Sequence, residues 1–394
     1  MVNSKKNIYL DGSSTSPPRV DVVERVRYIQ NNFWANPSSL HNDGIKAAEV
    51  LERSRQSISS RLGASPEEVV FTSGSTESNR ISIIGSSRML KPGRIVISAV
   101  EHPSVLSAAQ HLVKDGWQLE FWPVDENGQV DLSKLDLLLQ PPTKLVSIIW
   151  GQSEVGTLQP ISTIGQACRD KGIIFHTDAT QILSQSLFNW RKLPADLLSL
   201  SAHKFQGPKG VGILLNNHNS VIKTLPLIAD KAQENGYRPG TQPVALIAGM
   251  ALAIEHLDCL IKSNSNNQIT EYLKVYKLTQ LLRKEISTID SLIFTGHPTN
   301  RLNNHISMLV GSSNMQPISA RTLVRELSKE GICASSGTAC KSSSLEDSAI
   351  LEAMQIPCKW RKSGLRFSLG PWLEEDDIIA IPDILRKSII SVSN

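Results

Sequence analysis

Short apolar segments alternate with amphipathic helical stretches through the first two-thirds of this chain. This alternation restricts the fold more than any other feature of the sequence. The apolar segments have the length and composition of buried strands. They cover residues 69–71, 94–97, 118–122, 145–150, 173–176 and 197–200, and the helical stretches cover 47–61, 78–89, 104–114 and 161–171. The pattern predicts an α/β fold with a mostly parallel sheet covered by helices.

The pattern changes after about residue 240, in the part of the chain that we expect to form a smaller α/β domain. Helices are predicted at 244–261, 269–288 and 319–329, and strands at 292–294, 304–310 and 331–333. The N-terminal segment is expected to join this unit. The predicted organisation is a large domain of residues 17–255 and a small domain of residues 1–16 and 256–394.

Composition and charge limit the kinds of partner and compartment. The 394 residues carry a formal net charge of +4 without a dense basic block, so neither nucleic acid nor a membrane surface is indicated. No apolar run approaches the roughly 20 residues that span a bilayer. Residues 1–6 lack a signal-peptide pattern, which predicts the cytoplasm. The five cysteines form no CxxC pair, so we predict neither a disulfide framework nor a metal site.

The lysine at the end of the strand at 197–200 is a candidate cofactor anchor. Lys204 closes the tetrapeptide at 201–204 and precedes a glycine-rich turn at 207–212. Ligands of parallel sheets bind at the carboxyl ends of strands. A lysine there can form a Schiff base with the aldehyde of pyridoxal 5′-phosphate. The alternatives are an exposed loop lysine at 204 and, as second choice of Schiff base, Lys209 in the turn.

Two further strand ends carry residues suited to the same cofactor. Residues 72–76 are small or hydroxylic and precede Glu77 at the opening of a helix, which favours a phosphate site, although Ser75 or Thr76 could also be a plain helix cap. Asp178 follows a buried strand and needs a cationic partner there, and a pyridinium nitrogen would serve. The alternative for Asp178 is an exposed turn.

Three more residues have chemistry that suits an amino-acid substrate. His102 lies between a strand and a helix, where it can stack on a cofactor ring and move protons, or be an ordinary loop histidine. Arg366 lies in an apolar strand pattern and suits a substrate carboxylate or a structural salt bridge. Cys340 lies in a small, polar segment beside Lys341, which favours a reactive thiolate over an incidental surface thiol.

Taken in order, these segments resemble the cysteine desulfurases of the NifS/IscS type, which are fold-type I pyridoxal phosphate enzymes of the class V aminotransferase superfamily. The similarity extends over nearly the whole chain. Beside the opening Tyr9-Leu10-Asp11, the matching segments are 36–41, 72–79, 101–105, 154–160, 178–181, 201–204, 238–241, 335–340 and 365–370. The setting of Cys340 in S-S-G-x-A-C resembles group I of the family.

The resemblance implies a role for each candidate residue. Lys204, Cys340 and His102 would be catalytic, and Asn36 and Arg366 would bind the substrate carboxylate. The implied cofactor-binding residues are Ser75, Thr76, His102, Ser153, Asp178, Gln181, Ser201, Ala202, His203, Lys204 and Thr241. Among them Asp178 would pair with the ring nitrogen and Gln181 with the phenolic oxygen. Ser75, Thr76, Ser201 and His203 would hold the phosphate. Thr241 would reach the phosphate of a neighbouring subunit, which implies a homodimer.

The implied reaction converts L-cysteine to L-alanine and leaves the sulfur as a persulfide on Cys340. An acceptor or iron–sulfur scaffold protein would then take the sulfur, as in iron–sulfur cluster biogenesis. Two alternatives stay open. One is a lyase of the same fold that acts on cysteine, cystine or selenocysteine without a persulfide. The other is a weakly catalytic, pyridoxal phosphate-binding partner protein in a sulfur-transfer pathway.

The chain also departs from the family pattern. Gln152-Ser153 stands where the family has Asn-Asn, and Ser153 replaces the asparagine that bonds the phenolic oxygen. Residues 229–232 lack the family's glycines, and Pro371-Trp372 replaces an R-x-T-T stretch. These differences suggest a divergent member. They bear on substrate range, turnover and acceptor more than on cofactor binding.

Overall fold

A seven-stranded sheet forms the centre of the protein, with the strand order β2-β8-β7-β6-β5-β3-β4. The computed structural model describes residues 7–88, 90–217, 233–262, 271–337 and 347–393. The strands are β2 (Val69–Thr72), β3 (Arg94–Ser98), β4 (Gln118–Trp122), β5 (Thr143–Ser147), β6 (Ile174–Asp178), β7 (Leu197–Ser201) and β8 (Gly212–Asn216). Strands β3 to β7 pair in parallel, whereas β8 is antiparallel to both β2 and β7. The predicted mostly parallel sheet is therefore confirmed, and β8 is an addition to it.

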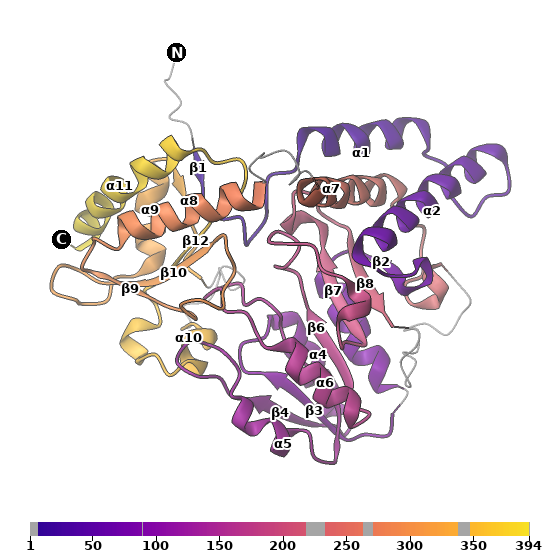
Figure 1. Cartoon of the computed structure of the whole chain (residues 1–394), viewed down its shortest axis with the longest axis horizontal. Helices are drawn as coiled ribbons and strands as arrows, with labels where there is room; N and C mark the ends of the chain where they lie inside the picture. The colour runs from indigo at the N-terminus through magenta and orange to yellow at the C-terminus, as the bar shows by residue number, and fades with distance from the viewer. Residues whose placement is uncertain (1–6, 89, 218–232, 263–270, 338–346, 394) are drawn as a thin grey trace.

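Helices cover both faces of this sheet, as Figure 1 shows. Alternate strand residues point to opposite faces, so Ile95 packs with α4 whereas Val96 packs in the cluster that includes α2, α6 and α7. The covering helices are α2 (Asn42–Leu62), α3 (Ser75–Arg80), α4 (Pro103–Lys114), α6 (Ile161–Asp170) and α7 (Val244–Lys262). Because both faces are covered, the central strands are buried along most of their length, whereas the edge strand β4 is mostly exposed.

The C-terminal part has a core of its own around a three-stranded sheet. Strand β10 (His305–Val310) pairs antiparallel with β9 (Leu292–Phe294) and β12 (Gly364–Ser368). Helices α8 (Glu271–Ile286), α9 (Ala320–Lys329) and α11 (Glu375–Ser393) pack against this sheet.

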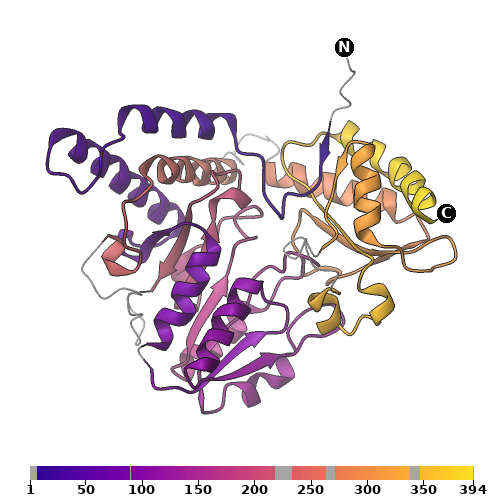
Figure 2. The same ribbon diagram turned by 180° about the vertical axis from the view of Figure 1, so that it is seen from behind.

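The N-terminal strand lies beside the C-terminal elements, as both overall views show (Figures 1 and 2). Strand β1 (Ile8–Tyr9) pairs in parallel with β11 (Ile332–Cys333). This pairing agrees with the expectation that the N-terminal segment joins the C-terminal unit. The boundaries proposed above for the two domains stay a prediction. Sequence patterns did not predict α1 (Val20–Asn32) or α11.

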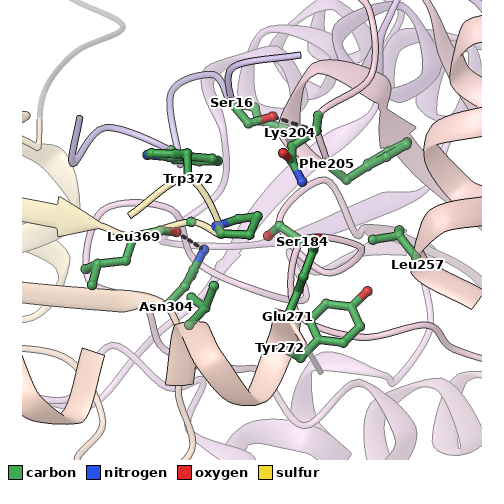
Figure 3. Close-up of a pocket in the computed structure, with 15 residues that line it drawn as sticks. Ser16, Ser184, Lys204, Phe205, Leu257, Glu271, Tyr272, Asn304, Leu369 and Trp372 are labelled. Atoms are coloured by element: carbon green, nitrogen blue, oxygen red, sulfur yellow. Dashed lines mark hydrogen bonds between the residues drawn. The ribbon is translucent and has the colours of Figure 1, made fainter. Parts of the chain in front are cut away.

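Trp372 fixes the N-terminal segment in place. Its Nε1 donates a hydrogen bond to the carbonyl oxygen of Tyr9 at 2.9 Å, and the two aromatic rings are 5.9 Å apart. A Cβ added to Gly370 would lie 2.1 Å from this indole, so the ring rests directly on the glycine. Figure 3 shows Trp372 and Lys204 among the side chains around a narrow cavity of about 40 Å³. Trp372, which differs from the family pattern, thus has a structural role. It holds the N-terminal segment, and this segment continues to the residues that contact Lys204.

We expect Gly165→Ala to destabilise the protein. A Cβ at this position of α6 would lie 2.3 Å from the carbonyl oxygen of Pro194 and 2.8 Å from the ring of Phe175. Such an overlap in a packed core costs about 1–3 kcal/mol, which exceeds the gain in helix propensity. Urea unfolding should measure this loss. Ser162→Ala, at an exposed position of the same helix, should change the free energy of unfolding by less than about 0.5 kcal/mol. Equal effects of the two substitutions would contradict the packing account.

Candidate active site

A cavity of about 340 Å³ lies at the carboxyl ends of the central strands. The predicted site residues that line it are Ser75, Thr76, His102, Ser153, Asp178, Gln181, His203, Lys204 and Arg366. They come from segments far apart in the sequence. The cavity therefore brings together most of the residues that the strand-end argument and the family resemblance selected.

Lys204 is held at the wall of this cavity by two main-chain carbonyl groups. The residue ends a short 3-10 turn, Ala202–Lys204, that directly follows β7. Its Nζ donates to the carbonyl oxygens of Ser13 at 2.6 Å and Ser14 at 2.8 Å. Lys209, the second choice of Schiff base, lines a neighbouring hollow and does not line this cavity.

The neighbouring hollow, of about 420 Å³, shares Ser75, Thr76 and His203 with the cavity and adds Ser201. At this hollow the backbone segments around Gly74 and Gly212 lie close to each other. A Cβ added to Gly212 would lie 2.6 Å from the Cα of Gly74, and one added to Gly74, whose φ is +150°, would lie 3.3 Å from the Ser201 Oγ. Small residues and hydroxyl donors at the start of a helix suit a phosphate group.

His203 is neutral at pH 7 in this site. Burial and the charges of Lys204 and Lys209 lower its pKa to about 4. Its Nδ1 is 3.1 Å from the Oγ1 of Thr15. A neutral imidazole still offers one N–H donor, so the residue can bind a phosphate oxygen without carrying charge itself.

Asp178 is a buried acid at the end of β6, with 3% of its surface exposed. Its Oδ2 accepts from the Nδ2 of Asn79 at 2.8 Å, and its Oδ1 accepts from the amide of Thr180 at 3.0 Å. Both partners are neutral donors. The alternative of an exposed turn aspartate is wrong, since the carboxyl group is buried at the cavity.

Arg366 makes a structural ion pair and keeps one donor unused. Its Nη2 contacts the Oδ1 of Asp11 at 2.6 Å and the Oγ of Ser14 at 2.7 Å. Its Nη1 donates to the carbonyl oxygen of Ser153 at 2.9 Å. Among the described residues, the buried Nε of Arg366 has no hydrogen-bond partner. The salt-bridge alternative is therefore realised, and the role of Arg366 toward a substrate carboxylate stays a prediction.

Some predicted site residues are not brought into the cavity. Asn36 and Thr241 are both exposed and line neither hollow. The Oδ1 of Asn36 accepts from the amide of Ser38 at 2.9 Å. Gln181 lines the cavity, but its Nε2 donates to the carbonyl oxygen of Ser13 at 3.0 Å. Cys340 and residues 229–232 lie outside the described residues, so their predicted roles stay predictions.

Sequence reasoning missed the contribution of the N-terminal segment and of two helical residues. Asp11 contacts Arg366, and the carbonyl groups of Ser13 and Ser14 accept from Lys204. Asn79 contacts both Asp178 and Ser104, and Ser104 contacts His102. The resemblance of Tyr9-Leu10-Asp11 to the family's opening was the available signal for this segment. Asn79 and Ser104 lie in the segments 72–79 and 101–105 that resemble the family, but the resemblance implied no role for either residue.

The residues present fit pyridoxal 5′-phosphate. One side of the site offers a lysine held by carbonyl oxygens. Another offers the buried Asp178 carboxylate, which accepts hydrogen bonds from neutral donors of the described residues. A hydroxyl-lined hollow with close glycine backbones adjoins them. These are the groups required by an aldehyde, a pyridinium nitrogen and a phosphate.

Residues 8–381 match the aminotransferase class-V family. The chain is a member of this family. It is 36% identical over 98% of its length to the cysteine desulfurase IscS of Dictyoglomus turgidum (95% of the relative). It is 35% identical over 97% to the cysteine desulfurase IscS of Methanosarcina thermophila (93% of the relative). A NifS-like protein from Rickettsia africae has a similar structure, with a TM-score of 0.83 and 28% identity over 98% of this chain and 100% of that chain. Within the class-V family this chain therefore belongs with the cysteine desulfurases, which use pyridoxal phosphate.

The described residues contain neither a membrane-spanning helix nor a cluster of metal ligands. Across residues 7–88, 90–217, 233–262, 271–337 and 347–393, no helix is long and apolar enough to cross a bilayer. The same ranges contain no cluster of three or more His, Cys, Asp or Glu side chains arranged to hold a metal ion.

Glu101 is a buried carboxyl group beside the site. Its Oε1 accepts from the Oγ of Ser98 and from the amide of Ile149, each at 2.6 Å. Its Oε2 is buried without a hydrogen-bond partner among the described residues. Burial, with a smaller contribution from the Asp178 charge, raises the pKa of Glu101 to about 8. The carboxyl group is thus mostly protonated at neutral pH.

We expect Glu101→Gln to flatten the pH dependence of stability. Because the folded-state pKa is raised, the stability associated with protonated Glu101 is complete below its unfolded pKa and is lost as pH rises through about 8. The wild type should therefore lose up to about 1.4 kcal/mol per pH unit relative to the variant between pH 5 and 8. Urea unfolding at several pH values measures this difference. The exposed Glu120→Gln is the matched control, and a parallel shift of Glu101→Gln and wild type at all pH values would contradict the assignment.

Proposed function

We propose that this chain removes the sulfur of L-cysteine, releases L-alanine and holds the sulfur as a persulfide on Cys340 for an acceptor. Its membership of the class-V family among the cysteine desulfurases makes it a pyridoxal phosphate-dependent enzyme of that class. The observation that carries the proposal is the meeting of Lys204, Asp178 and Arg366 in one cavity. A lysine, a ring acid and a carboxylate-binding arginine are what an amino-acid reaction on this cofactor needs.

Bound at Lys204, pyridoxal phosphate supplies an electron sink that stabilises negative charge at the substrate α-carbon. Asp178 would hold the ring nitrogen. Ser75, Thr76, Ser201 and His203 would hold the phosphate. The hydrogen-bond partners of the buried Asp178 are neutral donors, so its carboxylate would find a cationic partner in that nitrogen.

The remaining steps belong to residues of the chain. Arg366 would bind the substrate carboxylate through Nε, since Asp11, Ser14 and Ser153 occupy its other nitrogens. Lys204 would move a proton at the α-carbon. The thiolate of Cys340 would form an S–S bond to the substrate sulfur while the substrate C–S bond breaks. The electron pair of that bond stays on the carbon fragment, which takes a proton and leaves as alanine.

The proposal includes a cytoplasmic homodimer that delivers sulfur to an acceptor or iron–sulfur scaffold protein. The first helix and the loop after it support a dimer, because they expose Val20 at 75%, Trp34 at 72% and Leu40 at 94% of their surface. Such large exposed apolar side chains would be covered in an interface between subunits. Asn36 lies in the same loop and, like Thr241, lines neither of the two hollows described above. Both would then act at the active site of the neighbouring subunit.

We expect Lys204→Ala to abolish the covalent attachment of pyridoxal phosphate and to lower turnover of L-cysteine by at least about 10³-fold. Borohydride reduction followed by peptide mapping should place the cofactor on Lys204 in the wild type and in the control Lys209→Ala. A labelled peptide that contains Lys209 but not Lys204 would contradict the assignment.

We expect Cys340→Ser to stop sulfur transfer while leaving cofactor binding intact, because the substrate C–S bond then lacks its nucleophile. Alanine release from L-cysteine should fall by at least about 10²-fold, as measured by chromatography. Cys358→Ser is the matched control, since Cys358 is an exposed free cysteine. Undiminished release of alanine and sulfide by Cys340→Ser would favour a lyase instead.

A further inference from the structure

The tautomer of His102 is fixed by the start of helix α4. His102 is the N-cap residue, and Pro103 at the first helical position has no amide hydrogen. The first amide donor of the helix is therefore that of Ser104, which donates to the Nδ1 of His102 at 3.2 Å. A backbone amide can only donate, so Nδ1 must accept. The single hydrogen of the neutral imidazole is then on Nε2.

Asn79 determines the direction of the next hydrogen bonds. Its Nδ2 is 2.8 Å from the Oδ2 of Asp178 and 2.9 Å from the Oγ of Ser104. An ionised carboxylate only accepts, so the NH₂ group of Asn79 must face Asp178, and the same group donates to Ser104. The hydroxyl hydrogen of Ser104 is then left for the Nδ1 of His102, which is 2.7 Å away.

Asn79 and Ser104 are buried, so water does not replace them in these hydrogen bonds. Asn79 is fully buried and Ser104 is 7% exposed. The Oδ1 of Asn79 is buried without a hydrogen-bond partner among the described residues. Turning the amide over would place this oxygen against the Asp178 carboxylate, which is repulsive. The orientation of Asn79 therefore follows from the charge of Asp178.

We propose that Asn79 and Ser104 are positioning residues that link Asp178 to His102 and hold the imidazole as the neutral tautomer with hydrogen on Nε2. The inference rests on the proposed function, in which Asp178 and His102 both face the cofactor ring. A neutral imidazole can stack on a positively charged pyridinium without repulsion. Its Nε2 is the nitrogen left to exchange a proton with the reacting groups.

The linkage predicts that the charged form of His102 is disfavoured. The hydroxyl group and the backbone amide of Ser104 both donate to Nδ1, and protonation of Nδ1 would leave them without this acceptor. The titratable groups that line the cavity together with His102 are Asp178, His203, Lys204 and Arg366, and Glu101 precedes His102 in the chain. Substitutions at Ser104 leave all of these groups in place. A change in His102 after such a substitution therefore reports the hydroxyl itself.

Nitrogen-15 NMR of the histidine rings in the full-length protein tests the proposal. Wild-type His102, assigned with His102→Gln, should show an unprotonated Nδ1 and a protonated Nε2 at neutral pH. In Ser104→Ala the protonation midpoint should rise by about one pH unit, which is tenfold in the ratio of charged to neutral ring. Ser104→Thr should restore the wild-type signals, because it keeps the hydroxyl. Ser86→Ala is the matched control, since the buried Ser86 hydroxyl has no partner among the described residues.

Spectra recorded with and without added pyridoxal phosphate separate this inference from the proposed function. Unchanged His102 signals in Ser104→Ala, in a protein that binds the cofactor normally, would overturn the linkage and leave the function intact. A protonated Nδ1 in the neutral wild-type ring would also overturn it. The expected His102 signals in a protein that fails to bind pyridoxal phosphate would support the linkage and contradict the proposed function.

Discussion

The active site depends on the N-terminal segment that crosses from the C-terminal sheet to the large sheet. Trp372 holds the main chain at Tyr9, and beyond it Asp11 neutralises Arg366 while the carbonyl groups of Ser13 and Ser14 accept from Lys204. A buried guanidinium or ammonium group without such partners would be costly. The segment therefore allows the side chains of Lys204 and Arg366 to line the same cavity. It also joins the C-terminal elements to the lysine through hydrogen bonds rather than through apolar packing alone.

Burial divides the titratable groups of the site into neutral and charged members. Burial raises the pKa of Glu101 to about 8 and lowers the pKa of His203 to about 4, so both are mainly neutral at pH 7. Lys204 and Arg366 contact carbonyl or carboxylate oxygens of the chain, and Asp178 accepts only from neutral donors. The charges that remain are thus suited to groups of a cofactor and an amino acid. This selection explains how one compact cavity carries several ionisable residues without strong mutual repulsion.

The sequence was sufficient to predict the parallel sheet and the residues that directly follow its strands. Lys204 and Asp178 could be selected because their place at a strand end is readable from apolar segments. Strand β8 was missed because it begins at the end of the glycine-rich segment 207–212, whose composition predicts a turn. Asn79 and Ser104 were also missed, because their role arises only where helix α3 meets the start of α4, and pairwise contacts between distant residues have no periodic signature. The ion pair of Arg366 with Asp11 was hidden for the same reason.

The most direct test of this account is mass spectrometry of the Cys340 peptide after the pyridoxal phosphate-loaded protein has met L-cysteine, with alanine measured in the same sample. The account predicts that the peptide gains one sulfur atom, removable by a reductant, and that one alanine appears for each sulfur gained. Alanine and free sulfide without any added sulfur on Cys340 would contradict the central claim that this chain stores the sulfur of its substrate.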